Sequence, residues 1–295
     1  MAARGTWGRG LAAHAVLLTY TAIALFPVWL ILLNSVKSRR AIFGDPLALP
    51  IPAALLGLMG PDDRGRPPQA TLDLVGYATV AQNGDFFGYF LNSLIVTTGS
   101  LALVLLLGAM AAFALSEYRF RGNTLWGLYL ALGIMIPIRL GTVAILELMV
   151  AANLVNTRTA LVLVYTAQGL PLAVFILSEF MRTVSDDLKN AGRMDGLSEY
   201  AIFARLVLPL VRPAMATVAV FTMIPIWNDL WFPLILAPSE ATKTLTLGSQ
   251  VFIGQFETNW NAVLAALALS ILPVLILYLV FSRQLIRGIT AGAVK

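Results

Sequence analysis

Long apolar segments separated by polar stretches form the main pattern along this chain of 295 residues. Each segment is long enough to cross about 30 Å of hydrocarbon as an α-helix, which takes about 20 residues. The pattern therefore predicts an all-α membrane protein with six transmembrane helices. The predicted helices are 15–33, a stretch within 86–116, about 123–146, 159–178, about 213–236 and about 260–282.

The first apolar segment has some features of a secretory signal peptide, because Arg4 and Arg9 precede it. Its apolar run is too long, however, and no cleavage site of small residues follows it. We expect residues 1–33 to form a cytoplasmic N-terminus and an uncleaved first helix.

The polar stretches predict the loops. Residues 34–85 are rich in proline and glycine, which favours an irregular extracytoplasmic loop, with a short amphipathic helix within 71–82. Residues 238–259 form a second outer loop, and residues 181–212 form a charged loop on the opposite side. The last residues, 284–295, are predicted to be a short flexible tail.

The positive charges predict the orientation. With the N-terminus inside, twelve of the twenty lysines and arginines lie on the cytoplasmic side. Arg139 lies within the membrane, and five of the other seven lie in the long loop, where the positive-inside rule is weakest. Both termini are therefore expected in the cytoplasm, and the net charge of +5 indicates membrane orientation, not nucleic-acid binding.

Composition excludes several kinds of chemistry. Hydrophobic residues make up 59% of the chain and charged residues 12%, against about 25% charged in soluble domains. The chain has no cysteine, and His14 is its only histidine, which leaves little for a metal or triad site. No phosphate-binding G-x-x-x-x-G-K-[ST] sequence is present, so we expect this chain to bind no cofactor or metal.

The charged loop carries the most informative spacing. Residues 190–196 read Asn-Ala-Gly-Arg-Met-Asp-Gly, and nine residues later 206–210 read Leu-Val-Leu-Pro-Leu. Ser185 is a candidate N-cap, the two aspartates after it suit a helix N-terminus, and Gly196 permits a tight turn. The pattern predicts helix, turn and second helix, a compact knob that fits a partner's groove. The alternative is an ordinary solvated loop.

This segment resembles the EAA loop of binding-protein-dependent ABC importers, E-A-A-x-x-x-G-x9-I-x-L-P. Four further segments resemble the carbohydrate branch, in particular the smaller of the two maltose-type permeases. They are Phe-Leu-Asn-Ser-Leu at 90–94, Tyr-Arg-Phe-Arg-Gly at 118–122, Trp-Asn-Asp-Leu-Trp-Phe-Pro-Leu at 227–234 and Arg-Gly-Ile-Thr-Ala-Gly-Ala-Val-Lys at 287–295. This chain departs from the family pattern at Asn190, where the family has Glu, and at Gly192, where it has Ala.

The resemblance implies a type I ABC importer permease, with residues 86–283 as its transmembrane domain. It implies a heterodimer with a second homologous permease, an ATPase dimer that holds ATP and Mg, and an extracytoplasmic solute-binding protein. The setting would be a bacterial inner membrane. The residues that would contact the ATPase are Asn190, Ala191, Gly192, Arg193, Asp195, Gly196, Leu208 and Pro209, with Gly292 and Lys295 of the tail.

Six polar or aromatic residues in the predicted helices are candidates for the substrate path: Arg139, Gln168, Trp227, Asn228, Asp229 and Trp231. Arg139 either extends outward to the interface or faces the cavity, where it meets an anionic group or Glu147. Gln168 precedes Pro171, which lacks an N–H and is expected to break the hydrogen-bond ladder of helix four at its centre, where Gln168 would line the path; the alternative is an ordinary kink. The tryptophans are alternatively part of an interfacial aromatic belt.

The resulting hypothesis is a non-enzymatic subunit that translocates a sugar or sugar derivative. A second candidate substrate is another polar solute, such as a glycerol-phosphate-like or sulfonated sugar. A secondary transporter would need internal repeats and several buried charges, and only Arg139, Glu147 and Asp229 qualify. An intramembrane enzyme would need a Ser–His pair, paired aspartates or a metal cluster in the spans.

Overall fold

The computed structural model describes residues 4–50, 72–82, 85–253 and 258–293. Within these residues every regular element is a helix, and β-pairing is limited to two isolated bridges, Lys37–Leu72 and Ile253–Thr258. The all-α prediction is therefore confirmed. The chain divides into two compact units, Met1–Phe86 with Ser249–Leu272, and Phe87–Gly248 with Pro273–Lys295.

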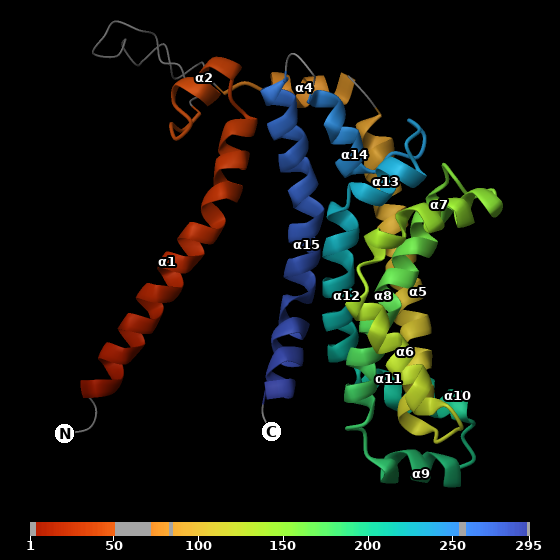
Figure 1. The fold of residues 1–295 in the computed structure, drawn as a ribbon. Helices are drawn as coiled ribbons and strands as arrows, with labels where there is room; N and C mark the ends of the chain where they lie inside the picture. Colours follow the sequence, from red (N-terminus) through yellow and green to blue (C-terminus); the bar gives the residue numbers. More distant parts are fainter. Residues whose placement is uncertain (1–3, 51–71, 83–84, 254–257, 294–295) are drawn as a thin grey trace, which may run out of the picture. The chain divides into compact units, whose positions relative to one another are not determined.

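The first unit contains the predicted first helix and part of the long outer loop. Its elements are α1 (Arg4–Ser35), α2 (Arg39–Gly44), α4 (Val75–Gln82), η3 (Gln250–Phe252) and the beginning of α15 (Trp260–Ala293) (Figure 1). The short helix predicted within 71–82 is α4. Most of the predicted loop, residues 51–71, lies outside the described residues.

The second unit contains the predicted helices two to five and the charged loop. Its elements are α5 (Phe86–Glu117), α6 (Asn123–Met135), η1 (Ile138–Gly141), α7 (Thr142–Ala151), α8 (Arg158–Met181), α9 (Asp186–Met194), α10 (Glu199–Ala201), η2 (Ile202–Val207), α11 (Leu208–Leu210), α12 (Arg212–Asn228), α13 (Trp231–Leu236) and α14 (Leu245–Ser249). In Figure 1, α9 lies across one end of this unit, and α7 and α13 lie at the opposite end.

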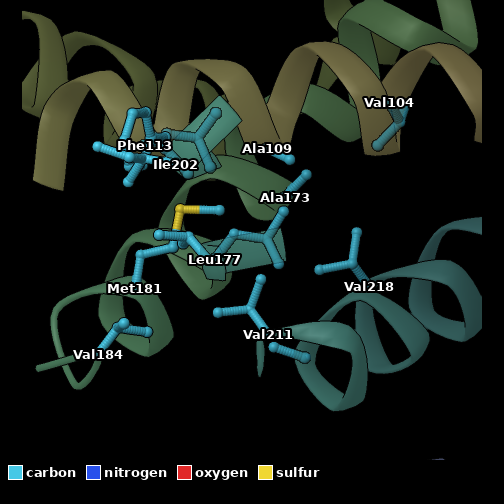
Figure 2. Packing of buried hydrophobic residues seen from close by; sticks show 14 residues of the cluster. Val104, Ala109, Phe113, Ala173, Leu177, Met181, Val184, Ile202, Val211 and Val218 are labelled. Atoms are coloured by element: carbon cyan, nitrogen blue, oxygen red, sulfur yellow. The ribbon is translucent and has the colours of Figure 1, made fainter. Parts of the chain in front are cut away.

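Small residues let the helices of the second unit approach closely. A side chain on Gly169 of α8 would lie 2.8 Å from Val104 of α5, and one on Gly108 would lie 2.9 Å from Ala173. Such contacts matter in a membrane, where lipid is as apolar as the side chains and close packing drives helix association. Figure 2 shows the resulting buried cluster, which α5, α8, η2 and α12 all supply.

The apolar helices agree in part with the six predicted spans. Three described helices are long and apolar enough to cross a membrane: Ala13–Ser35, Phe86–Glu117 and Arg158–Met181. Two bent pairs, Asn123–Met135 with Ile138–Ala151 and Glu199–Leu210 with Arg212–Asn228, raise that number to five if each pair is one span. Trp260–Ile276 is a shorter apolar helix. The chain is thus a multi-pass membrane protein by the length and composition of these helices.

Two predicted continuous helices are broken. The third was expected over 123–146, but α6 ends at Met135, and the chain bends by 89° before the helical segment that ends with α7. Pro137 lies in this break. The fifth was expected over 213–236, but α12 ends at Asn228 and α13 starts at Trp231, because the carboxylate of Asp229 accepts the backbone N–H of Phe232 (3.0 Å).

Pro171 lies inside α8, which remains one continuous α-helix from Arg158 to Met181. The proline has no N–H to donate to the helical ladder, but the helix continues through it. The tail was predicted to be flexible, but the backbone is helical up to Ala293 as part of α15. Gly292 therefore lies in a helix, and Lys295 lies outside the described residues.

Candidate functional site

The predicted knob in the charged loop is present. Helix α9 begins after Ser185, whose side chain accepts the backbone N–H of Asp187 (3.2 Å), as an N-cap does. The acidic residues Asp186 and Asp187 occupy its first turn and Arg193 its last, an order that suits the helix dipole. The loop therefore carries a stable short helix in place of an irregular solvated segment.

Gly196 makes the turn that follows α9. Its φ of +78° lies in the left-handed region, which glycine adopts without the penalty that a Cβ brings. The backbone N–H of Gly196 donates to the carbonyl of Arg193 (3.1 Å), and that of Leu197 donates to the carbonyl of Gly192 (3.0 Å). These bonds cap the end of α9 and direct the chain into α10.

The second helix of the knob packs back onto the first. It runs through α10, the π-helix η2 and α11, which contains Leu208 and Pro209. Gly192 is buried against Leu206, whose Cδ1 would lie 2.9 Å from a Cβ at position 192. This close approach gives a physical reason for glycine where the family pattern has alanine.

A charged cluster ties the knob to the end of α5. Glu117, the last residue of α5, accepts from Lys189 Nζ (2.5 Å) and from Arg193 Nη2 (2.6 Å). Arg193 Nε also contacts Glu199 (2.8 Å), and Tyr118 Oη donates to the same carboxylate (2.7 Å). These five side chains connect α5, α9 and α10.

The cluster changes the pKa values of its members. Hydrogen bonds from Arg193 and then Tyr118 lower the pKa of Glu199. Burial, followed by the hydrogen bond to Glu199, raises the pKa of Tyr118 to about 12. Burial opposes the charge on Lys189, but the hydrogen bonds to Asp186 and Glu117 leave its pKa raised. At neutral pH the cluster therefore holds charged, paired groups.

The outer surface of the knob is exposed. Met194 is 88% exposed and Tyr200 is 80% exposed, on either side of the Gly196 turn. Asn190, Ala191 and Asp195 are also exposed. The amide oxygen of Asn190, at the position of the family Glu, accepts from Arg193 Nη1 (2.9 Å).

At the other end of the second unit, Arg139 and Asp229 meet. Arg139 Nη2 lies 3.0 Å from Asp229 Oδ1, and Tyr165 Oη donates to Oδ2 (2.9 Å). The aspartate side chain is 8% exposed and the arginine side chain 64%. The partner of Arg139 is therefore Asp229, and the sequence-based suggestion of Glu147 was wrong.

The aromatic candidates separate into two groups. Trp227 is 3% exposed and stacks edge-on against Phe90, so it belongs to the packed interior. Trp231 is 42% exposed, lies 6.0 Å from the Arg139 guanidinium and donates its indole N–H to Thr142 (3.0 Å). Exposed Asn228 donates to the carbonyl of Ile224. Arg139, Asp229 and Trp231 are thus brought together, whereas Trp227 is buried against Phe90.

Gln168 lies apart from that cluster, in an open groove of about 710 Å³ between α6 and α8. The groove is otherwise mostly apolar, with Tyr129 on the α6 side, and its lining residues carry no charge. The two helices approach closely beside it, since a Cβ on Gly133 would lie 2.8 Å from Pro171. In the described part of the chain, no three His, Cys, Asp or Glu residues are grouped so as to hold a metal ion.

Sequence reasoning missed Glu117, Tyr118 and Tyr165 as site residues. Glu117 lies 72 positions before Lys189, and Tyr165 lies 64 before Asp229, so local spacing gave no sign of these pairs. The available signal was that Glu117 is the first charged residue after a 31-residue uncharged segment, 86–116.

The apolar helices, with the α9–α11 knob at one end of the second unit, define a multi-pass membrane protein. Residues 83–291 match the family described as "Binding-protein-dependent transport system inner membrane component". The match covers more than half of the chain, and the chain belongs to this family of importer permeases.

Similar proteins are permeases of named transport systems. The diacetylchitobiose uptake system permease protein NgcG of Streptomyces coelicolor is 30% identical, over 96% of this chain and 88% of its own. The arabinooligosaccharides transport system permease protein AraQ of Halalkalibacterium halodurans is 30% identical, over 92% of each chain. A bacterial ABC transporter involved in the import of alginate has the same fold, with a TM-score of 0.73 at 21% identity, over 96% of this chain and 98% of that one.

Proposed function

We propose that this chain translocates an oligosaccharide or other sugar derivative through a bacterial inner membrane as one permease of an ABC importer. The observation that carries the proposal is the α9–α11 knob on a chain of this family. Two relatives about 30% identical are named for diacetylchitobiose and arabinooligosaccharide uptake, which favours a saccharide as the solute.

The proposed assembly has two permeases, this chain and a second homologous one, above an ATPase dimer that binds ATP and Mg. An extracytoplasmic binding protein delivers the solute. The proposed topology is six spans with both termini inside, in which α6–α7 and α12–α13 are broken spans. Transport is then mechanical, because ATP-driven closure moves the docked knob and changes the access of a midplane path.

The proposed ATPase contacts are the exposed residues of the knob and the end of the chain. They are Asn190, Ala191, Asp195 and Gly196, with Gly292 and Lys295, while Gly192, Arg193, Leu208 and Pro209 shape the knob. The proposed path residues are Gln168 in the groove and Arg139, Asn228, Asp229 and Trp231 near the broken spans.

Reconstitution tests this proposal. The complex of both permeases, the ATPase and the binding protein is placed in proteoliposomes with ATP inside, and uptake of labelled N,N′-diacetylchitobiose, arabinotriose and digalacturonate is measured. We expect ATP-dependent uptake of at least one saccharide, and none with an ATPase that lacks its phosphate-loop lysine. Absence of ATPase from the purified complex, or ATP-independent uptake, would overturn the proposal.

A further inference from the structure

The carboxylate of Glu117 joins two elements that are far apart in sequence. Its two oxygens accept from Lys189 and Arg193, both on α9, at 2.5 and 2.6 Å. The side chains of Glu117 and Lys189 are 10% and 6% exposed, so this contact is largely shielded from water. Hydrogen bonds between a carboxylate and an ammonium or guanidinium group are roughly twice as strong as those between neutral groups.

The two chain segments that join α9 to its neighbours hold it less firmly than these side-chain contacts do. Residues 182–185 join it to α8, and the Gly196 turn joins it to α10. No side chain fills the space around Gly196, because an added Cβ would have nothing within 4 Å. The Glu117 contacts, with the Tyr118–Glu199 bond beside them, supply a third attachment, directly to the end of α5.

We propose that Glu117 is a positioning residue that fixes α9 to α5, so that movement of the docked ATPase is delivered to α5. This inference rests on the proposed function. Asn190 has no charge, so the acidic groups that hold Arg193 are Glu117 and Glu199. Because α5 is one unbroken helix of 32 residues, a displacement at its end reaches the opposite end of the unit.

A Glu117→Gln variant keeps the size of the side chain and removes its charge. We expect uptake per ATP hydrolysed to fall by at least about fivefold, the low end of usual coupling effects. Co-purification of the ATPase with the variant should remain. The matched control is Glu179→Gln, which removes an exposed ion pair with Arg182 at the end of α8 and should leave the ratio unchanged.

A covalent link provides the rescue. The chain has no cysteine, so a Glu117→Cys/Lys189→Cys variant can be joined by a short bifunctional thiol reagent. Before treatment we expect this variant to be uncoupled, and after treatment its uptake per ATP should return toward the wild-type ratio. The wild-type complex treated with the same reagent is the control. A wild-type ratio in Glu117→Gln, or a linked variant that stays uncoupled, would overturn the inference.

A distance measurement separates this inference from the proposed function. Spin labels at Leu107→Cys on α5 and Leu188→Cys on α9, both exposed positions, report how firmly the two helices are joined. We expect one narrow distance distribution with and without ATP, and a broadened distribution when Glu117→Gln is added. Equal widths for wild type and Glu117→Gln would contradict the attachment of α9 to α5 by Glu117, even if no saccharide were transported. Failed uptake with a narrow wild-type distribution would count against the proposed function alone.

Discussion

Asp229 shows how one buried carboxylate organises an end of the second unit. It accepts from Arg139, from the hydroxyl of Tyr165 and from the backbone of Phe232. A buried charge is costly unless it is paired and hydrogen-bonded. The three donors satisfy this requirement, and they place the exposed Arg139 guanidinium beside Trp231.

Replacing Asp229 and replacing Arg139 should lower the thermal stability of the protein by different amounts. Asp229→Ala leaves the buried Tyr165 hydroxyl and Phe232 N–H without an acceptor, at about 1–3 kcal/mol for each group. Arg139→Gln removes a partner that is 64% exposed, for which about 1 kcal/mol is expected. Thermal unfolding of the purified complex should therefore show a clearly larger loss for Asp229→Ala.

The same pair bears on solute charge. Because Asp229 already neutralises Arg139, the pair presents no net charge, and we expect a double Arg139→Gln/Asp229→Asn variant to change the uptake of neutral and acidic saccharides by the same factor. A loss confined to digalacturonate would show instead that Arg139 reads an anionic solute. Leu140→Ala serves as the control at the adjacent position, where the side chain is 81% exposed and is not a proposed path residue.

Glu199 gives the knob a defined acid sensitivity. Hydrogen bonds from Arg193 and Tyr118 lower the pKa of Glu199. The stability that its charge gives the folded state is therefore complete above the ordinary pKa of 4.5, and it is lost as the pH falls through the lowered pKa. We expect wild type to unfold at a higher temperature than Glu199→Gln near neutral pH. The difference should shrink below about pH 4, and a difference that is constant with pH would contradict this account.

Among the elements, the knob was predictable because its signals are local. The Ser185 cap, the aspartates of the first turn and the Gly196 turn all act within one short stretch. The broken helices were not predictable from proline alone. Pro171 and Pro225 lie inside continuous helices, whereas Pro137 lies in a break.

Long-range pairs account for what the sequence left open. The position of Glu117 depends on partners more than 70 residues away, and Arg139 contacts Asp229 across 90 residues. By contrast, the bounds of helices with a nearly uniform apolar character were predicted closely. The predicted segment 86–116 corresponds to the observed helix Phe86–Glu117. Local pattern therefore determined the helices, and tertiary contacts determined the breaks and the charged clusters.

The Gly196 turn can be tested as an element. Gly196→Pro loses the bond from its N–H to the Arg193 carbonyl and cannot adopt φ of +78°. We expect binding-protein-stimulated ATP hydrolysis and uptake to be uncoupled, with membrane insertion retained. Gly127→Ala is the matched control. A Cβ at Gly127 also meets nothing within 4 Å, but this residue lies in helix α6 and does not have a positive φ. Wild-type coupling in Gly196→Pro would count against docking through the knob.

At the largest scale, the second unit carries its two candidate sites at opposite ends. The knob of α9–α11 lies at one end, and α7 and α13 lie at the other (Figure 1). Helix α5 has 32 residues and measures about 48 Å at 1.5 Å per residue, enough to connect the two ends. Under the proposed function, this arrangement suits a subunit in which movement of the ATPase at the knob changes the access of the path at the far end.

That arrangement requires the two ends to face opposite sides of the membrane, which single cysteines can test. Four positions outside the apolar helices serve: Arg40, Arg121, Ser198 and Ser239. With six spans and both termini inside, Arg40→Cys and Ser239→Cys should react with an impermeant maleimide added to intact cells. Arg121→Cys and Ser198→Cys should react only after permeabilisation, and wild type, which has no cysteine, gives the background. Labelling of Ser198→Cys in intact cells would place the knob outside, where no ATPase could reach it, and would overturn both the topology and the docking proposal.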